Sequence, residues 1–444
     1  MTDGNTLKRI TLFAIPCIIG NALQNLYNIL DSVIVGKSDD ITALAAVGAT
    51  GSLITLFLNT VTGLMTGFAV TVGKRYGARD AEGVKKAYSN ALLLTFGLAV
   101  LISFFAAVFA DEMLEMMNTP EQIMDSASRY LKIVFIGMIF SVLYNFFCEM
   151  LRAVGNSRMP LVFLLISSLI HIVLILIFLF VFSMGVVGAA LSTVLSQLCA
   201  ALLCYVYIRL KLPQFRISAD ILKPERAVMA ECLKIGIPMA VTNFVVMFGG
   251  IILSFVTNGI GMEYIAAYTC ASRVGYIVTT PIFGFATALA VFTAQNMGSG
   301  NLLRIKEGIK KTFAAVTGVN ILLFVAFWFA AEPLMSFMLN GETVAVEAAK
   351  TYLLTRCGAM FTLTFAAGYK NVLNSMGRTA FPTLSGFIEI GVRYLIPLTL
   401  SGVLGFICVP LTDAVSWTVL AVFLTIAYFI EIRKIERNGR KNEE

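Results

Sequence analysis

The sequence predicts an all-α polytopic membrane protein of twelve transmembrane helices, arranged as two six-helix lobes. The composition is strongly apolar, with 58% hydrophobic and 13% charged residues and a mean hydropathy of +0.85, whereas soluble domains carry about 25% charged residues. The apolar runs are about 20 residues or longer, which favours helices over the ~10-residue alternating strands of a membrane barrel. The third observation that supports this fold class is an internal repeat.

The second half of the chain repeats the first at an almost constant offset. Five positions recur 221 residues later: Ala45, Gly63, Val70, Gly77 and Lys85 return as Ala266, Gly284, Val291, Gly298 and Lys306. Elsewhere the offset changes by only one, from 222 for the pairs Pro16/Pro238 and Gly155/Gly377 to 220 for Gly185/Gly405. So few gaps indicate duplication of one large unit. In a membrane protein, a duplicated bundle is the usual frame for alternating access.

Hydropathy places six spans in the first half of the chain, each long enough for a ~30 Å apolar layer. The first span, 12–36, follows Lys8 and Arg9 and superficially resembles a signal peptide. It contains Pro16 and Gln24, lacks a small-x-small cleavage site and leads into further spans, so we expect it to remain uncleaved. The five apolar runs that follow are 43–73, 87–109, 127–151, 160–182 and 186–208.

The second half contains six further apolar runs. They cover 230–257, 264–296, 309–331, 348–373, 381–402 and 405–431. Residues 210–228, which include Pro213 and Pro224, form the longest polar connection. We therefore expect an N-terminal lobe at 1–209, a cytoplasmic linker at 210–228 and a C-terminal lobe at 229–444.

Basic residues concentrate in alternate connections and predict the orientation of the chain. One set of connections carries most of the Lys and Arg residues, such as Lys74 and Arg75, whereas the opposite set carries acids such as Asp111 and Glu332. The positive-inside rule then places both termini in the cytoplasm, which requires an even number of spans. Both lobes share one orientation, so their pseudo-two-fold axis runs along the membrane normal. These loops explain the net charge of +7, and no nucleic-acid partner is expected.

The sequence has no pattern that marks a catalytic, metal or cofactor site. All eight cysteines fall inside or at the ends of apolar runs without a CxxC spacing, which favours a structural role over a redox or metal role. The chain also lacks HExxH, GxSxG and P-loop motifs and an Asp-rich metal motif, and it has only one histidine. We therefore expect no enzymatic activity, no metal and no cofactor.

Several short motifs resemble those of one transporter family. They are YNILDSVIVG at 27–36, LRAVGNS at 151–157 before Pro160, GVVGAALST at 185–193 and QNMG at 295–298. Together with the six-plus-six repeat, they resemble the multidrug and toxic compound extrusion (MATE) transporters over nearly the whole chain. The resemblance is closest to the prokaryotic branch that includes the DNA-damage-inducible-F-like proteins. It implies efflux of organic, usually cationic, compounds in exchange for H⁺ or Na⁺.

Asp31 is the first candidate for ion coupling, because ionisable residues inside spans are costly and commonly functional. Counting back from Gly36 places it about 7–8 Å below the outer boundary. A carboxyl group in a poorly hydrated site favours its protonated form, so it can take up and release a proton near neutral pH. Its repeat partner is Leu253, so the charge occurs in one lobe only. The alternative is a capping or ion-pair role near the interface.

His171 and Thr193 join Asp31 as candidate cation-coupling residues. His171 lies in the middle of the fifth span, where it can share a proton with Asp31 through a water or be a structural hydrogen-bonded residue. The resembled family often has Asn at this position and an Asp one turn later, where this chain has Ile175. Asp31 and Thr193 leave few oxygen ligands for Na⁺, so we expect H⁺ as the coupling ion.

Polar residues in two spans are candidates for the substrate pathway. Gln24, Tyr27 and Asn28 lie on the same face of the first span as Asp31, and Asn243 is the repeat partner of Asn21. This polar face is expected to point into the bundle rather than at lipid.

Three charged residues of the second half belong to the same candidate pathway. Glu389 and Arg393 are spaced i,i+4, and they either form a structural ion pair or present Glu389 to a cationic substrate. Asp413, the repeat partner of Thr193, can complete an acidic cluster with Glu389, and Arg393 is the repeat partner of His171. Arg356 is expected near a span end, where its charge reaches the interface.

We therefore predict a secondary antiporter of the inner or plasma membrane that exports amphipathic organic cations in exchange for H⁺ (or Na⁺). Its partners are small organic cations and the lipid bilayer, and we expect a monomer. The alternative is a flippase for lipid-linked oligosaccharide in the same superfamily, which would need basic side chains to hold pyrophosphate. Arg273, Arg356 and Arg393 suit that alternative, whereas the acids Asp31 and Glu389 argue against it.

Overall fold

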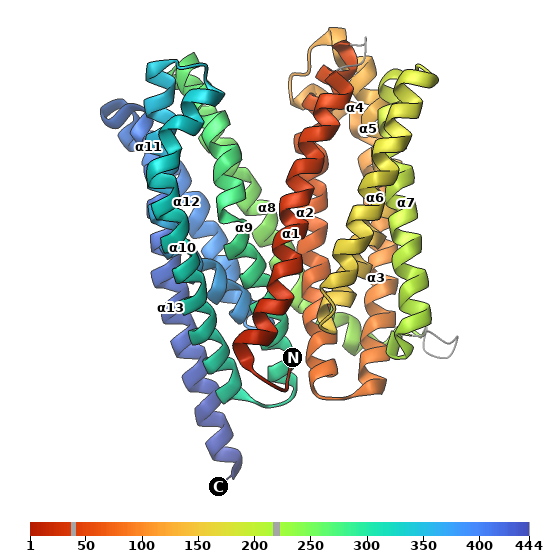
Figure 1. The fold of residues 1–444 in the computed structure, drawn as a ribbon. Coiled ribbons are helices and arrows are strands. Elements are labelled where there is room, and N and C mark those ends of the chain that lie inside the picture. Colours follow the sequence, from red (N-terminus) through yellow and green to blue (C-terminus); the bar gives the residue numbers. More distant parts are fainter. Residues whose placement is uncertain (37–40, 216–222, 444) are drawn as a thin grey trace. The chain divides into compact units, whose positions relative to one another are not determined.

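The computed structural model describes residues 1–36, 41–215 and 223–443, and in this part of the chain the regular structure is entirely helical (Figure 1). The twelve long helices of these residues are α1 (Thr6–Gly36), α2 (Ile41–Gly77), α3 (Ala81–Val108), α5 (Glu121–Ala153), α6 (Arg158–Leu176), α7 (Gly185–Lys211), α8 (Arg226–Ile260), α9 (Met262–Gly298), α10 (Leu302–Met338), α11 (Thr343–Ser375), α12 (Ala380–Leu404) and α13 (Cys408–Glu443). Four short elements accompany them: α4 (Ala110–Met116), the π-helix η1 (Ile177–Val181) and the 3₁₀ turns η2 (Pro213–Phe215) and η4 (Gly405–Ile407).

The long helices confirm the predicted all-helical fold class. Eleven of the twelve predicted spans fall on one long helix each to within a few residues, and the fifth, 160–182, covers α6 and η1. Most helices extend beyond the predicted limits. For example, α10 begins at Leu302, whereas the apolar run begins at residue 309. Hydropathy detects only the apolar centre of a span, whereas the backbone hydrogen bonds of a helix continue into its polar ends.

Ten segments of the described residues are long and apolar enough to cross a membrane. The number is ten because α12 and α13 form one continuous candidate, Ala380–Arg437, and because α11 is not among the candidates. Arg356 and several polar residues lower the hydropathy in the middle of α11. The helix α11 is therefore less apolar than the candidate spans because it carries a charged residue, Arg356, far from its ends.

Contacts between Cα atoms divide the chain into two compact units that differ from the two halves of the sequence. The N-terminal unit is Ile19–Ala240, and the C-terminal unit combines Met1–Ile18 with Val241–Glu444. The divisions fall inside α1 and α8, whereas the predicted division lay in the linker 210–228. Each division follows a proline inside its helix by two residues, Pro16 in α1 and Pro238 in α8. The first segment of each of these helices thus belongs to a different unit from the rest of the helix.

Each unit is packed around one central helix. In the N-terminal unit α5 contacts α2, α3, α6 and α7, and in the C-terminal unit α11 contacts α9, α10, α12 and α13. These contacts correspond one to one under the sequence repeat. Each central helix contributes many side chains to the apolar core of its own unit. The duplication read from the sequence therefore reappears as a duplicated packing arrangement.

Repeated residues of the two halves make the same local structure. Asp80 and Asn301, which lie 221 positions apart, cap α3 and α10 by accepting hydrogen bonds from the backbone N–H groups of Gly83 at 2.8 Å and Arg304 at 3.0 Å. Gly155 and Gly377 follow α5 and α11 with φ angles of 90° and 80°. A side chain is strained in that conformation, which explains why glycine stands at both positions.

Candidate functional site

The predicted site residues lie in both units. Asp31, the first candidate for ion coupling, lies on α1 together with Tyr27 and Asn28, but the side chains of residues 27–33 lie outside the described part of the structure. Gln24 is exposed in the N-terminal unit, and Asn243 is half-buried on α8 in the C-terminal unit. The roles assigned to these five residues therefore stay predictions.

His171 and Thr193 are brought together inside the N-terminal unit, where α6 packs against α7. His171 is 1% exposed, and its Nε2 lies 3.3 Å from the hydroxyl oxygens of both Ser192 and Thr193. Each hydroxyl donates its own proton to the carbonyl oxygen of Ala189, at 2.8 Å from Ser192 and 3.1 Å from Thr193. Nε2 of His171 therefore lies within hydrogen-bonding reach of both hydroxyl groups, and the imidazole tautomer decides which group donates.

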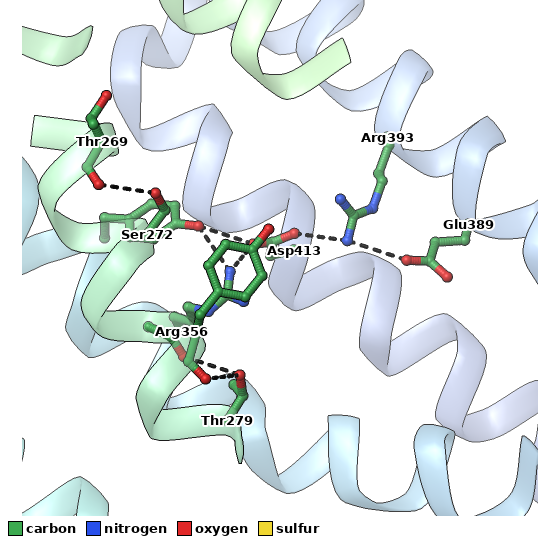
Figure 2. Close-up of polar contacts among 10 residues, drawn as sticks. Thr269, Ser272, Thr279, Arg356, Glu389, Arg393 and Asp413 are labelled. Atoms are coloured by element: carbon green, nitrogen blue, oxygen red, sulfur yellow. Dashed lines mark hydrogen bonds and ion pairs between the residues drawn. The ribbon is translucent and has the colours of Figure 1, made fainter. Parts of the chain in front are cut away.

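Four charged side chains form a continuous network inside the C-terminal unit (Figure 2). Arg356 of α11 donates from Nη1 to Oδ2 of Asp413 on α13 at 2.7 Å. Arg393 of α12 lies 3.1 Å from the other oxygen of Asp413 through Nη2, and the same nitrogen lies 3.2 Å from Oε1 of Glu389. The order is therefore Arg356, Asp413, Arg393 and Glu389, and this set is called the charge network below.

The charge network contains the predicted pair Glu389–Arg393, which is present as an i,i+4 ion pair on α12. Asp413 joins this pair as expected, but the two acids do not touch each other, because Arg393 lies between them (Figure 2). The formal charge of the network is zero. Removing one partner from a buried ion pair leaves an uncompensated charge and costs about 3–5 kcal/mol, so the four side chains stabilise one another as a set.

The expectation that Arg356 lies near a span end is wrong. Arg356 lies well inside α11, which begins at Thr343, and it is 8% exposed. The predicted span begins at residue 348, eight residues before Arg356, which corresponds to about 12 Å along a helix axis. This spacing already indicated that Arg356 lies deep in the span. What the sequence could not show was the partner, because Asp413 lies on a different helix.

Aromatic rings surround the guanidinium of Arg356. Its Cζ lies 5.0 Å from the ring centre of Trp417, 5.5 Å from that of Tyr276 and 5.9 Å from that of Tyr352. Each distance is within the ~6 Å range of a cation–π contact. Tyr352 also accepts a hydrogen bond from Arg356 Nη1 at 2.9 Å and donates one to Asp413 at 3.3 Å. None of these three aromatic residues had been singled out from the sequence.

Two glycines allow the arginine side chains to pass close to neighbouring helices. An ideal Cβ atom on Gly275 of α9 would lie 2.7 Å from Cδ of Arg356, and one on Gly249 of α8 would lie 2.6 Å from Cδ of Arg393. Real Cβ contacts are essentially never this short. The aliphatic part of each arginine therefore occupies the space that a side chain on the neighbouring helix would fill.

The two units carry different chemistry at equivalent positions. His171 and Thr193 in the N-terminal unit correspond by the repeat to Arg393 and Asp413 in the C-terminal unit, and each pair is in contact. One unit thus has a hydrogen-bonded pair where the other has an ion pair. Among the described side chains, no group of three or more His, Cys, Asp and Glu residues is arranged to hold a metal ion.

Comparisons with known proteins agree with the repeat. A family model described as MatE matches residues 16–177 and again 238–399, which begin 222 positions apart. The probable multidrug resistance protein YpnP of Bacillus subtilis (strain 168) is 32% identical over 355 residues, which cover 79% of this chain and 78% of YpnP. The multidrug export protein MepA of Staphylococcus aureus (strain MRSA252) is 24% identical over 434 residues, 96% of this chain and 94% of MepA. The crystal structure of MATE in complex with MaL6 has the same fold, with a TM-score of 0.90, 22% identity and 98% of each chain covered.

Proposed function

Because the chain belongs to the MatE family of membrane transporters, we propose that it exports amphipathic organic cations from the cytoplasm in exchange for protons. The observation that carries this proposal is the match of the family model to both halves of the chain. It confirms the MATE resemblance that the motifs indicated. The names of YpnP and MepA refer to multidrug resistance and export, which favours drug export over the flippase alternative.

In the proposed mechanism, Asp31 holds the proton. Protonation of Asp31 in the outward-facing state releases the bound cation, because the site then loses its negative charge. Deprotonation on the cytoplasmic side restores that charge and readies the site for the next cation. His171 and Thr193 assist proton binding, whereas Gln24, Tyr27, Asn28, Asn243, Glu389, Arg393 and Asp413 contribute to the substrate pathway. Glu389 and Asp413 are supported in this role by their burial in a unit that belongs to a transporter.

Three finer assignments belong to the same proposal. The protein acts as a monomer in the plasma membrane, with both termini in the cytoplasm, as the distribution of basic loops suggests. It belongs to the DNA-damage-inducible-F-like branch of its family, on the strength of the motifs at 27–36 and 185–193. Protons drive the exchange rather than Na⁺, since the usual set of oxygen ligands around the fifth span is incomplete.

The test is transport of ethidium in proteoliposomes under separately imposed pH and Na⁺ gradients. We expect the pH gradient alone to drive transport, and Asp31→Asn to abolish it while the protein still inserts and elutes as a folded species. Asp125→Asn is the matched control, because Asp125 is an exposed acid that pairs with Arg129 at the start of α5. Proton-driven transport that survives in Asp31→Asn, or transport driven by Na⁺ alone, would contradict the proposal.

A further inference from the structure

The rings around Arg356 form a site whose chemistry suits an organic cation. Tyr276 of α9, Tyr352 of α11 and Trp417 of α13 face the guanidinium from three helices, and Asp413 supplies one carboxylate. This set of four residues is called the aromatic cage below. Aromatic faces combined with a negative charge are the usual means by which proteins recognise quaternary ammonium groups. In this structure, the cation inside the aromatic cage is a side chain of the protein itself.

The aromatic cage leaves part of the hydrogen-bonding capacity of the Arg356 guanidinium unused. A guanidinium carries five N–H donors, and here Nη1 makes the hydrogen bonds to Tyr352 and Asp413. Its Nε is buried and has no hydrogen-bond partner. A buried donor without a partner is unfavourable. A cation that has no N–H groups would keep the contacts with the rings and the charge attraction to Asp413. It would lose the hydrogen bond to Asp413 that Nη1 donates, and it would leave no donor unpaired.

Asp413 does not depend on Arg356 alone for charge balance. Its other oxygen lies 3.1 Å from Arg393, which also pairs with Glu389 (Figure 2). If a ligand cation replaces the guanidinium of Arg356, the total charge of the network stays at zero. If Arg356 leaves without replacement, the network carries one net negative charge. The arrangement therefore favours exchange of one cation for another.

The aromatic cage is more accessible on one side than on the others. The neighbouring Tyr276 is 58% exposed, in contrast to Trp417 and Tyr352, which are buried. The exposed ring marks the side on which the aromatic cage can open.

We propose that the aromatic cage is a binding site for an organic cation without N–H donors, such as a quaternary ammonium or pyridinium group, and that Arg356 occupies this site when no ligand is bound. The inference rests on the proposed function, since it names one binding position of the substrate pathway, within the C-terminal unit and separate from Asp31. Arg356 then acts as a tethered competitor that the substrate must displace. Removing its charge should strengthen binding.

Tryptophan fluorescence tests this directly, because the chain has only two tryptophans, Trp328 and Trp417. In the full-length Trp328→Phe protein, all tryptophan emission comes from the aromatic cage. The probe is N-methylpyridinium, a permanent cation without N–H groups that quenches tryptophan on contact. We expect saturable quenching, with a half-saturation concentration at least tenfold lower once Arg356→Met is added. Methionine keeps much of the aliphatic stem and removes the charge.

The matched control is Arg378→Met in the same background, because Arg378 pairs with Glu431 at 3.0 Å in the same unit but is not part of the aromatic cage. Its half-saturation concentration for N-methylpyridinium should stay within twofold of that of the Trp328→Phe protein. If Arg356→Met does not fold, Tyr276→Leu replaces an exposed ring and should weaken binding at least tenfold. Linear, collisional quenching in the Trp328→Phe protein, or equal half-saturation with and without Arg356, overturns the proposal.

The transport assay separates this inference from the proposed function. Ethidium export driven by a pH gradient, combined with purely collisional quenching of Trp417, would reject the aromatic cage as the binding site and leave the proposed function standing. Saturable quenching that tightens in Arg356→Met, without any export, would support the aromatic cage and reject the proposed function.

Discussion

Replacing Gly275 with alanine should separate Arg356 from Asp413 and destabilise the C-terminal unit. The new Cβ would lie 2.7 Å from Cδ and 2.8 Å from Nε of Arg356, whereas ordinary contacts begin at 3.4 Å. The side chain must therefore move by about 0.7 Å or more, the difference between 3.4 and 2.7 Å. A shift of this size stretches the 2.7 Å bond to Asp413 beyond the normal range.

The expected loss of unfolding free energy in Gly275→Ala is the difference between a weakened hydrogen bond and a gain in helix propensity. A hydrogen bond to a charged group contributes about 1.5–3 kcal/mol, and the formal charge of the network stays at zero because Arg356 is displaced but not removed. The better helix propensity of alanine offsets about 1 kcal/mol. The net destabilisation is about 0.5–2 kcal/mol, and 1 kcal/mol corresponds to about 2–4 °C in Tm for domains of 150–250 residues. Gly275→Ala should therefore lower the Tm of the detergent-solubilised protein by about 1–8 °C.

Gly391→Ala is the matched control, since a Cβ at Gly391 of α12 meets nothing within 4 Å. Its Tm should equal that of the unmodified protein or exceed it slightly, because only helix propensity changes. In an Arg356→Ala background, Gly275→Ala should no longer be destabilising. The reasoning is refuted if the Tm of Gly275→Ala equals that of Gly391→Ala, or if Gly275→Ala still lowers the Tm in the Arg356→Ala background.

Two further predictions concern the N-terminal unit. Gly67→Ala should lower Tm more than twice as much as Gly236→Ala, because a Cβ on Gly67 would lie 2.6 Å from the backbone N of Gly236, whereas a Cβ on Gly236 would come no closer than 3.0 Å to any atom. Hydrogen bonds from Lys132 and Ser128 hold the pKa of Asp111 below its usual 3.8. Its stabilising contribution, under about 0.5 kcal/mol at 45% exposure, is present at pH 5–7 and is lost as the pH falls below 3.8. The Tm difference between the unmodified protein and Asp111→Asn should disappear over that range, and a difference that grows in acid would contradict it.

The positions of the helices could be predicted because hydropathy is a local property. A span of about 20 apolar residues forms a helix in a membrane whatever surrounds it, since its backbone hydrogen bonds must be satisfied internally. The ion pair of Glu389 with Arg393 was predictable for the same reason, because both residues lie one turn apart on α12. The ends of the helices were less predictable, since polar end residues carry no hydropathy signal.

The division of the chain into units was not predictable from the repeat. The repeat correctly indicated that two similar bundles exist, and α5 and α11 do have equivalent neighbours. It could not show that the first segments of α1 and α8 belong to different units from the rest of each helix. That assignment depends on which helices a segment packs against, and a repeat in the sequence contains no information about such contacts.

The amino-acid order alone was enough for the helical class, the duplication, the family and the short-range pairs, because each depends on composition or on residues a turn apart. The environment of Arg356 depended on the folded bundle. Its aromatic rings, its carboxylate and the glycine beneath its stem come from α9, α11 and α13, and only the relative register of these helices brings them within contact. A buried charge is stabilised by groups distant in sequence, so its role appears only once helices are packed together.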